Sequence, residues 1–476
     1  MIATAFVKKG QAEPVVDVWQ RPADWLPLPA VPAQGLVGLS AVYEDFTSLV
    51  AVKARTSVAA ASGGGYLVDW GDGSTPQEYA ENTTASKVLD WNAYPTESLT
   101  SRGYRQAIIK VTPKVGQNLT QILLQSHPEQ GGGQSAWLDV EINGTTALTA
   151  IGIGSTRAVL LERAKIHSFG NVTSLAGLFN GCRALREVLL PTSATKITSF
   201  ASMYKDCQSL TTAPYLEAPN ITTIAAMFYG CNNLVSVPTL NTAKVTTMAQ
   251  AFQLCTKLES VQSVFASGVC TSTSSMFNSC CSLKNAPSFS DTSKVTTTAS
   301  MFANCFSLES APTMNCTAVT NNSAMFSNCY ALRAIPAYVF SKTTNISSFA
   351  YNAFLLEDLS HITINPLCSN FSNFCYSAVS LKTLPALNLS SSTNNTGAFY
   401  AASSLRSIVA TGIKAAIDVR YCSLSAVALN AIFTNLVSRV GQTALIIYVR
   451  GNLGLTQTGY DPTIATAKNW TVNTTT

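Results

Sequence analysis

The chain has few charged residues, and this limits what its surface can bind. Charged side chains make up 12% of the 476 residues, whereas about 25% is usual for a globular protein. The net charge is only +5, and no run of five or more lysine and arginine residues occurs. Because a nucleic-acid-binding surface needs a clustered basic patch, we expect no nucleic-acid partner. The surface should instead be built from serine, threonine, asparagine and glutamine.

Long apolar runs are also missing. The best run, ALIIYV at 444–449, has the length of a strand, whereas a membrane-spanning helix needs about 20 apolar residues. The N-terminal stretch MIATAFVKKGQAEPVVDVW has no apolar core of the length that a secretory signal requires. We therefore expect no membrane insertion, no signal peptide, and synthesis in the cytoplasm.

Histidine is scarce, and the motifs of common active sites are absent. The three histidines, His127, His167 and His361, are far apart in the sequence, and we expect His127 to face solvent in a glycine-rich loop. The chain has no HExxH, no nucleophile elbow, no CxxC pair and no phosphate-binding loop. A glycan hydrolase would need paired carboxylates, which the central part of the chain does not offer at matched positions. We expect a protein that is not an enzyme and that holds no cofactor and no metal.

Cysteine, by contrast, is plentiful, and it marks a repeat. The phrase MFYGCNNL (227–234) recurs as MFNSCCSL (276–283), MFANCFSL (301–308) and related octets. The spacings between the shared cysteines are 25, 24, 24, 25, 25 and 24 residues. A fixed period of this size predicts a solenoid whose coils bury their apolar sides against one another. The shared cysteines are Cys182, Cys207, Cys231, Cys255, Cys280, Cys305 and Cys329.

The same period extends the repeat in both directions. Stepping forward reaches Ala353, Ala378, Ala402 and Ala426, each followed three residues later by leucine, and stepping back reaches the neighbourhood of Arg157, with Leu160 in the leucine position. The solenoid is therefore expected over 155–430. Each coil should contribute one short strand to a parallel sheet, and a proline often follows that strand.

The replacement of cysteine by alanine indicates that this position requires a small apolar side chain. Neighbouring cysteines would stand about 4.8 Å apart in a straight row, which suits neither a relaxed disulfide nor a tetrahedral metal site. Cys281 lies outside this column, and its equivalents in other repeats are Asn232, Thr256 and Phe306. We expect Cys280→Ala to cost about 1 kcal/mol or less, and Cys280→Ser to cost more because its hydroxyl would lack a partner.

The repeat resembles the BspA-type leucine-rich repeat, which is found in bacterial surface proteins and in phage structural proteins. The stretch LNTAKVTTMAQAFQLCTKLESV and its neighbours carry Val-Thr, Met-Phe, Cys and Leu at the offsets of that family. The resemblance covers more than half of the chain. It implies a curved, right-handed solenoid that serves adhesion and recognition. Repeats after about 346 depart from the pattern by losing cysteine and methionine.

Residues 36–154 predict a β-sandwich. YLVDW (66–70) and RQAIIKVTP (105–113) have the composition of strands, and GDGS (71–74) of a tight turn. The phrase DWGDGS resembles the turn of PKD-type immunoglobulin-like domains, at Asp69, Trp70, Gly71, Asp72 and Gly73. The two aspartates could ligate calcium. The alternative, which we favour, is that they accept hydrogen bonds from backbone N–H groups of the turn.

Residues 1–35 predict an extended arm. The stretch VWQRPADWLPLPAVPAQG is rich in proline, which favours an extended path without internal hydrogen bonds. Such an arm cannot bury Trp19 and Trp25 by itself. They should dock either on the chain's own sandwich or on a partner subunit. The combination of RPADW with DWGDG resembles phage virion proteins.

Residues 431–476 predict a cap on the last coil. The stretch 423–440 places Leu429, Ile432, Phe433, Leu436 and Val437 on one helical face, with Ser425 as N-cap. A strand at 444–452 and a helix starting at Asp461-Pro462 should follow. Such an ending resembles that of phage proteins with these repeats. The fold class is thus mainly β with short helical turns: an arm, a PKD-type sandwich, a leucine-rich-repeat solenoid and an α/β cap.

The resemblances and the missing motifs together indicate a structural and recognition protein of a bacteriophage virion, such as a tail, baseplate or neck fibre component. Its expected partners are other virion proteins, a host-surface glycan or protein, and further copies of itself. It would be located in the virion after synthesis in the host cytoplasm. The alternative is a bacterial cell-surface adhesin with the same repeats, which would need an export signal or an anchor.

Overall fold

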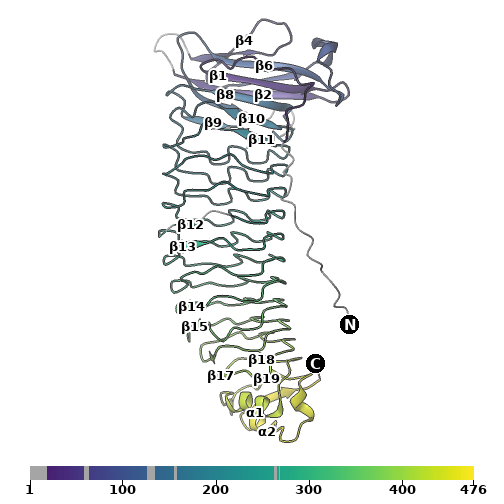
Figure 1. Ribbon diagram of the computed structural model, residues 1–476, viewed down its shortest axis with the longest axis vertical. Helices are drawn as coiled ribbons and strands as arrows, with labels where there is room; N and C mark the ends of the chain where they lie inside the picture. Colours follow the sequence, from purple (N-terminus) through teal and green to yellow (C-terminus); the bar gives the residue numbers. More distant parts are fainter. Residues whose placement is uncertain are drawn as a thin grey trace, which may run out of the picture.

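The protein is an elongated β structure with a sandwich at one end and two helices at the other (Figure 1). This computed structural model describes residues 19–57, 64–125, 135–154, 158–261, 265–266 and 268–475. Between the two ends, the chain winds through a stack of coils, which is a β-solenoid (Figure 1). The predicted mainly β fold and the predicted solenoid are therefore confirmed.

The larger sheet of the sandwich is antiparallel at its centre. Strand β1 pairs with β6 from Leu36 opposite Val111 to Val42 opposite Arg105, and every β1 residue is buried. Strands β3 and β6 coincide with the predicted strands to within one residue. In spatial order the sheet contains β11 (Glu187–Leu189), β10 (Arg163–Ile166), β8 (Trp137–Asn143), β1 (Gly35–Val42), β6 (Arg105–Pro113), β3 (Gly65–Asp69) and β4 (Gln77–Ala80).

The smaller sheet covers the inner face of the larger one. Tyr66, Trp70 and Trp137 are fully buried between the sheets, and aromatic side chains of this size contribute much of the buried apolar area. Two short 3-10 turns, η1 (Trp91–Ala93) and η2 (Thr96–Ser98), precede β6. In spatial order the smaller sheet contains β5 (Thr84–Leu89), β2 (Ser48–Thr56), β7 (Leu119–Leu124) and β9 (Ala150–Gly152).

The sandwich and the solenoid share one sheet. Strand β10 pairs in parallel with β8 of the sandwich on one side and with β11 of the next coil on the other. The predicted boundary between 154 and 155 therefore does not separate two bodies, because backbone hydrogen bonds continue across it. The solenoid extends directly from the sheet of the sandwich.

Parallel bridges connect successive coils at intervals of 24 or 25 residues over most of the stack. One column runs Ser199, Thr223, Thr247, Ser272, Thr297, Asn321, Asn345, Asn370 and Asn394. Some coils add short strand pairs, which are β12 (Phe265–Ala266) with β13 (Phe289–Asp291), β14 (Val339–Phe340) with β15 (Thr363–Ile364), and β16 (Leu387–Asn388) with β17 (Ala410–Thr411).

Apolar columns fill the interior of the coils. Phe228, Phe252, Phe277 and Phe302 stack with ring centroids 5.2 to 5.6 Å apart and planes within 14° of parallel. The cysteine and leucine columns lie beside them and are fully buried. No coil could bury these side chains alone, so each coil depends on its neighbours.

The repeat ends differ from the simple period. In the coil before Cys182, Ala158 and Leu161 are the buried residues of the small and leucine positions; Leu160 is half-buried, and Arg157 lies outside the described residues. At the other end, Cys422 rather than Ala426 takes the small position, because its thiol contacts Phe399 O as the other cysteines contact the preceding coil. This last coil is therefore four or five residues shorter, and Ala426 begins a helix.

The C-terminal part combines helices with a parallel sheet. Helix α1 (Ala426–Thr434) starts at Ser425, whose Oγ accepts a hydrogen bond from Ala428 N at 3.2 Å, as predicted. Val437 lies beyond this helix and is 43% exposed, so its predicted place on the buried face is wrong. The sheet contains β18 (Ile417–Asp418), β19 (Leu445–Tyr448) and β20 (Trp470–Asn473), with η4 (Leu453–Thr456) and α2 (Thr463–Thr466) between the last two.

Candidate functional site

The repeat cysteines form a column inside the solenoid, and the thiols from Cys207 to Cys329 each donate to a backbone carbonyl of the preceding coil. The Sγ of Cys280 donates to the carbonyl oxygen of Phe252 in the preceding coil at 3.0 Å. The other five column cysteines from Cys207 to Cys329 make the equivalent contact at 3.0 to 3.1 Å. Burial raises the pKa of the Cys280 thiol well above its usual range, so the thiol stays neutral and unreactive. The sequence pattern indicated the small side chain but not the carbonyl acceptor.

All thirteen cysteines are free. Cys281, which has no place in the column, is half-buried, and its Sγ lies 3.5 Å from Ser279 O. Among the described residues, no group of three or more His, Cys, Asp or Glu side chains is arranged to hold a metal ion.

The two aspartates of the DWGDGS turn bind groups of the protein itself. Asp69 Oδ1 accepts from Gly71 N at 2.9 Å, and Asp72 Oδ1 accepts from Ser74 N and Ser74 Oγ. Asp72 also pairs with Lys87. Burial alone would raise the pKa of Asp72, but Lys87 and Ser74 outweigh it and lower the pKa to about 2. The geometry fits the second of the two interpretations, in which the aspartates accept hydrogen bonds from backbone N–H groups of the turn.

Glycine is required in this turn because of its backbone conformation. Gly71 and Gly73 have φ of 72° and 78°, which strains other residues. Trp70 is fully buried, and its Nε1 donates to Gln77 Oε1 at 3.1 Å. The turn residues thus hold β3 and β4 together.

The described part of the arm docks on the chain's own sandwich. Trp25 is only 3% exposed, and its Nε1 donates to Tyr104 Oη at 2.8 Å. Trp19 is half-buried against the edge of Trp25, with ring centroids 6.2 Å apart. Of the two docking places expected for Trp25, the structure has the chain's own sandwich, so Trp25 is not free for a partner. Residues 1–18 lie outside the described part of the chain.

A buried charge network fastens this arm. Asp139 is fully buried, and its two carboxylate oxygens bind Arg21 of the arm at 2.8 Å and Arg163 of β10 at 2.9 Å. Arg163 also binds Glu141 and Glu187. Removing one member would leave a buried charge uncompensated. The network joins arm, sandwich and first coils into one unit.

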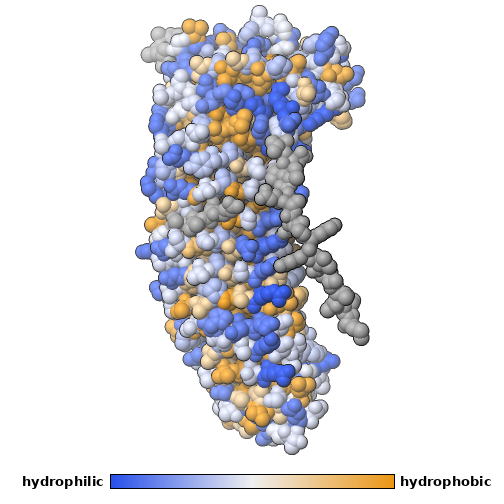
Figure 2. All heavy atoms as spheres, in the orientation of Figure 1, coloured by the Kyte–Doolittle hydropathy of each residue, from blue (hydrophilic) through white to orange (hydrophobic). Residues whose placement is uncertain are grey.

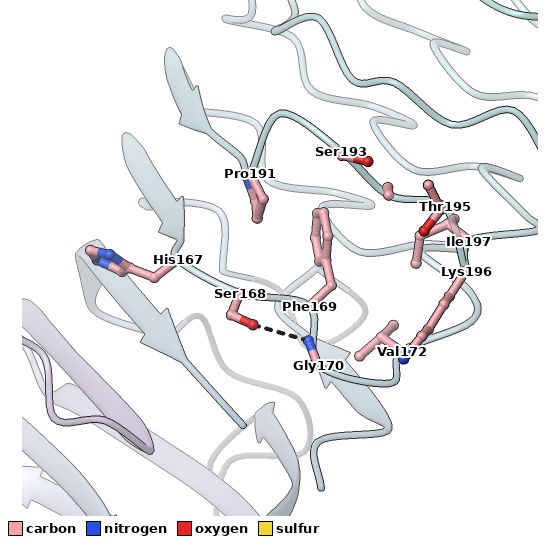
Figure 3. Close-up of a pocket in the computed structure, with 11 residues that line it drawn as sticks. His167, Ser168, Phe169, Gly170, Val172, Pro191, Ser193, Thr195, Lys196 and Ile197 are labelled. Atoms are coloured by element: carbon pink, nitrogen blue, oxygen red, sulfur yellow. Dashed lines mark hydrogen bonds between the residues drawn. The ribbon is translucent and has the colours of Figure 1, made fainter. Parts of the chain in front are cut away.

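A hollow of about 230 Å³ lies beside these first coils (Figure 3). The His167 ring points away from the other labelled side chains in Figure 3, and its Nε2 lies 2.7 Å from Glu141. Ser168 Oγ accepts a hydrogen bond from Gly170 N at 3.2 Å. His361, far along the stack, contacts Asp358 and Ile335 O, whereas His127 lies outside the described residues. The described histidines are thus brought near neither each other nor a cysteine of the column.

The outer face of the solenoid carries a column of threonines that the sequence predicted only as a Val-Thr step. Each hydroxyl donates to the backbone carbonyl of the equivalent residue one coil earlier, at 3.0 to 3.3 Å. In the view of Figure 2, hydrophobic residues on the solenoid form separate patches among pale and blue ones. The donors are Thr198, Thr222, Thr246, Thr271, Thr296, Thr320, Thr344, Ser369 and Thr393.

Two rows of aromatic side chains occupy the outer surface of the C-terminal coils. Phe306, Tyr330 and Phe354 are 37 to 40% exposed and stack with centroids 5.0 Å apart. The second row, which we call the tyrosine row, comprises Tyr351, Tyr376 and Tyr400, with centroids 4.9 and 4.7 Å apart. The Arg420 guanidinium lies over Tyr400 at 5.0 Å. These rows could not be predicted from the sequence, because the alignment of residues between neighbouring coils was needed to show that the rings stack.

Part of the solenoid matches a known family model. Residues 160–236, 216–314 and 270–362 match the family model described as "Mycoplasma protein of unknown function, DUF285". No curated protein matches the chain. None of the helices in the described residues has the length and apolar character needed to cross a membrane. The three overlapping matches fall on the stacked coils, and together they fit a repeat protein built as a β-solenoid.

Proposed function

We propose that the chain is a structural and recognition protein of a bacteriophage virion, a tail, baseplate or neck fibre component. It would attach to other virion proteins through its N-terminal part and present the solenoid to a host-surface glycan or protein. Self-association into a homo-oligomer belongs to the same proposal. Within it, the coils are BspA-type leucine-rich repeats, the sandwich is PKD-type, and the C-terminal helices and sheet cap the last coil.

One observation supports this proposal above the others. The sandwich, which would attach the chain, continues directly into the solenoid, whose extended surface carries few charges. The parallel pairing of β8, β10 and β11 fixes the solenoid to the sandwich. The threonine column and the aromatic rows offer hydroxyl and ring contacts that repeat from coil to coil. Such a surface favours many short-range contacts over long-range steering by charge.

Mass spectrometry of purified virions tests the location. The chain should be present in purified particles at a fixed number of copies per particle, as expected of a structural component. Its absence from particles, together with its presence in bacterial envelopes, would refute the virion proposal. Purified full-length chain should also compete with virions for adsorption to host cells if the solenoid contacts the host surface.

A bacterial cell-surface adhesin is the second candidate. The matching family model is described from Mycoplasma, which is a bacterium, and this favours a cellular protein. Fractionation of the cells that encode the chain would support this candidate if the chain remained with washed envelopes.

A further inference from the structure

The shortened last coil leaves a hollow at the C-terminal end of the tyrosine row. Cys422 follows Ala402 by 20 residues, whereas the preceding steps of the small-residue column are 24 or 25. The hollow has a volume of about 350 Å³, which lies within the usual range for small-ligand sites. It is lined by Thr396, Gly397, Ala416, Ile417, Asp418, Arg420 and Tyr448, and we call it the C-terminal hollow.

A backbone donor in this hollow has lost the partner that its equivalents have. In the preceding coils, Ser348 N donates to Ser372 O and Asn373 N donates to Thr396 O, both at 2.8 Å. Gly397 is the next residue in this series, with φ of 62°. None of the described residues accepts a hydrogen bond from its N–H, although the residue is buried. A backbone N–H is a strong donor, and Gly397 lines the hollow, so this N–H is available to an acceptor on a ligand.

The side chains around the hollow offer a donor and an acceptor without net charge. Arg420 binds Asp418 through two parallel contacts, Nε to Oδ1 at 3.0 Å and Nη2 to Oδ2 at 2.8 Å. The guanidinium still has N–H groups to donate, because it carries five in all. Because the pair is already neutral, an anionic ligand would meet the Asp418 carboxylate as well as Arg420 and gain little.

Aromatic and aliphatic groups supply the apolar part of the site. The Arg420 guanidinium lies over the ring of Tyr400 and over that of Tyr448, with its central carbon 5.0 Å from each centroid. These cation–π contacts hold the guanidinium in place. Ile417 is fully buried beneath the hollow. The polar groups are thus fixed before a ligand arrives, which lowers the entropy cost of binding.

We propose that the C-terminal hollow binds a neutral saccharide unit of a surface glycan. A sugar hydroxyl both donates and accepts, so vicinal hydroxyls can bind Asp418, Arg420 and the Gly397 N–H together. The C–H face of the sugar would lie against the Tyr448 ring, with Ile417 supporting the floor of the hollow. The inference rests on the proposed recognition function and specifies where one sugar residue is held.

The test uses purified full-length chain and saturation-transfer difference NMR with D-glucose, D-galactose, D-mannose, N-acetyl-D-glucosamine and L-rhamnose. Two variants block the hollow from different sides: Ala416→Phe and Thr396→Trp, the second at an exposed position. Val115→Trp, at a fully exposed position of the sandwich, is the matched control for added bulk. At least one neutral sugar should give a signal that falls fivefold or more in both blocking variants and stays unchanged in Val115→Trp.

Three results would overturn the proposal: no signal from any of the five sugars, a signal that both blocking variants retain, or a stronger signal from D-glucuronate than from D-glucose. Circular dichroism of each variant shows whether the coils remain folded. If the chain binds a sugar but is absent from virions, the sugar site is supported and only the virion proposal is refuted. If the chain is a virion component but binds none of these sugars, only the sugar site is refuted.

Discussion

At the scale of single residues, the thiol column shows how a small side chain can also complete a hydrogen bond. The Cys280 thiol donates to Phe252 O. We expect Cys280→Ala to lower the free energy of unfolding by about 1 kcal/mol, because it loses this weak bond and little volume. Cys280→Ser should cost a similar amount, because its hydroxyl finds the same acceptor. Thermal unfolding of the full chain measures both changes.

This expectation for serine replaces the one drawn from sequence alone. Without the carbonyl of Phe252, a serine hydroxyl at 280 would be buried and unpaired, and its cost would exceed that of alanine. Cys280→Val is the useful control, because extra volume in a filled column should cost about 1 to 3 kcal/mol. A serine variant far less stable than both alanine and valine would show that the carbonyl is not a usable acceptor.

Asn322 is a second residue whose role no sequence pattern could reveal. It is fully buried, and neither its Oδ1 nor its Nδ2 has a partner among the described residues. In the next coil, the position equivalent to Asn322 is occupied by the buried Ile346. We expect Asn322→Leu to raise the free energy of unfolding by about 1 to 3 kcal/mol, because it removes an unpaired polar group.

The matched control is the adjacent asparagine. Asn321 Oδ1 accepts a hydrogen bond from Ser323 N at 3.0 Å. Asn321→Leu should therefore lower the free energy of unfolding, whereas Asn322→Leu should raise it. Melting temperatures of the two variants give the comparison. A lower melting temperature for Asn322→Leu would show that the amide at this position is satisfied, for instance by a bound water.

At the scale of elements, the arm is held by a few contacts that can be removed one at a time. Trp25 is buried, its indole binds Tyr104 Oη, and Leu26 N donates to Gln106 Oε1 at 2.8 Å. We expect Trp25→Ala to free the arm and to speed amide hydrogen exchange over 19–34, because large apolar contacts and a buried hydrogen bond are lost. Trp19→Ala should have a smaller effect, because Trp19 is only half-buried. Equal exchange in the two variants would contradict this account.

Elements with local signals were predictable, and elements set by distant contacts were not. The strand at 105–113, the glycine turn at 71–73 and the cap at Ser425 each follow from residues beside them, and the structure has all three. The docking of Trp25 depends on Tyr104, 79 positions away. The C-terminal hollow forms because the last coil is a few residues shorter than the others. The sequence did not reveal this, because Leu429 of α1 happens to lie at the spacing expected for the next repeat leucine.

At the scale of the whole molecule, the stack predicts that one coil can be removed and half a coil cannot. Deleting 306–329 joins Cys305 to Tyr330 and keeps every apolar column in register, because these residues span one period. Since each coil contacts only its neighbours, the shortened chain should remain soluble and melt within a few degrees of the full chain. Deleting 306–317 instead should turn apolar side chains outward and cause aggregation. Size-exclusion chromatography and circular dichroism distinguish the two, and similar behaviour of both deletions would refute the view that the coils are interchangeable units.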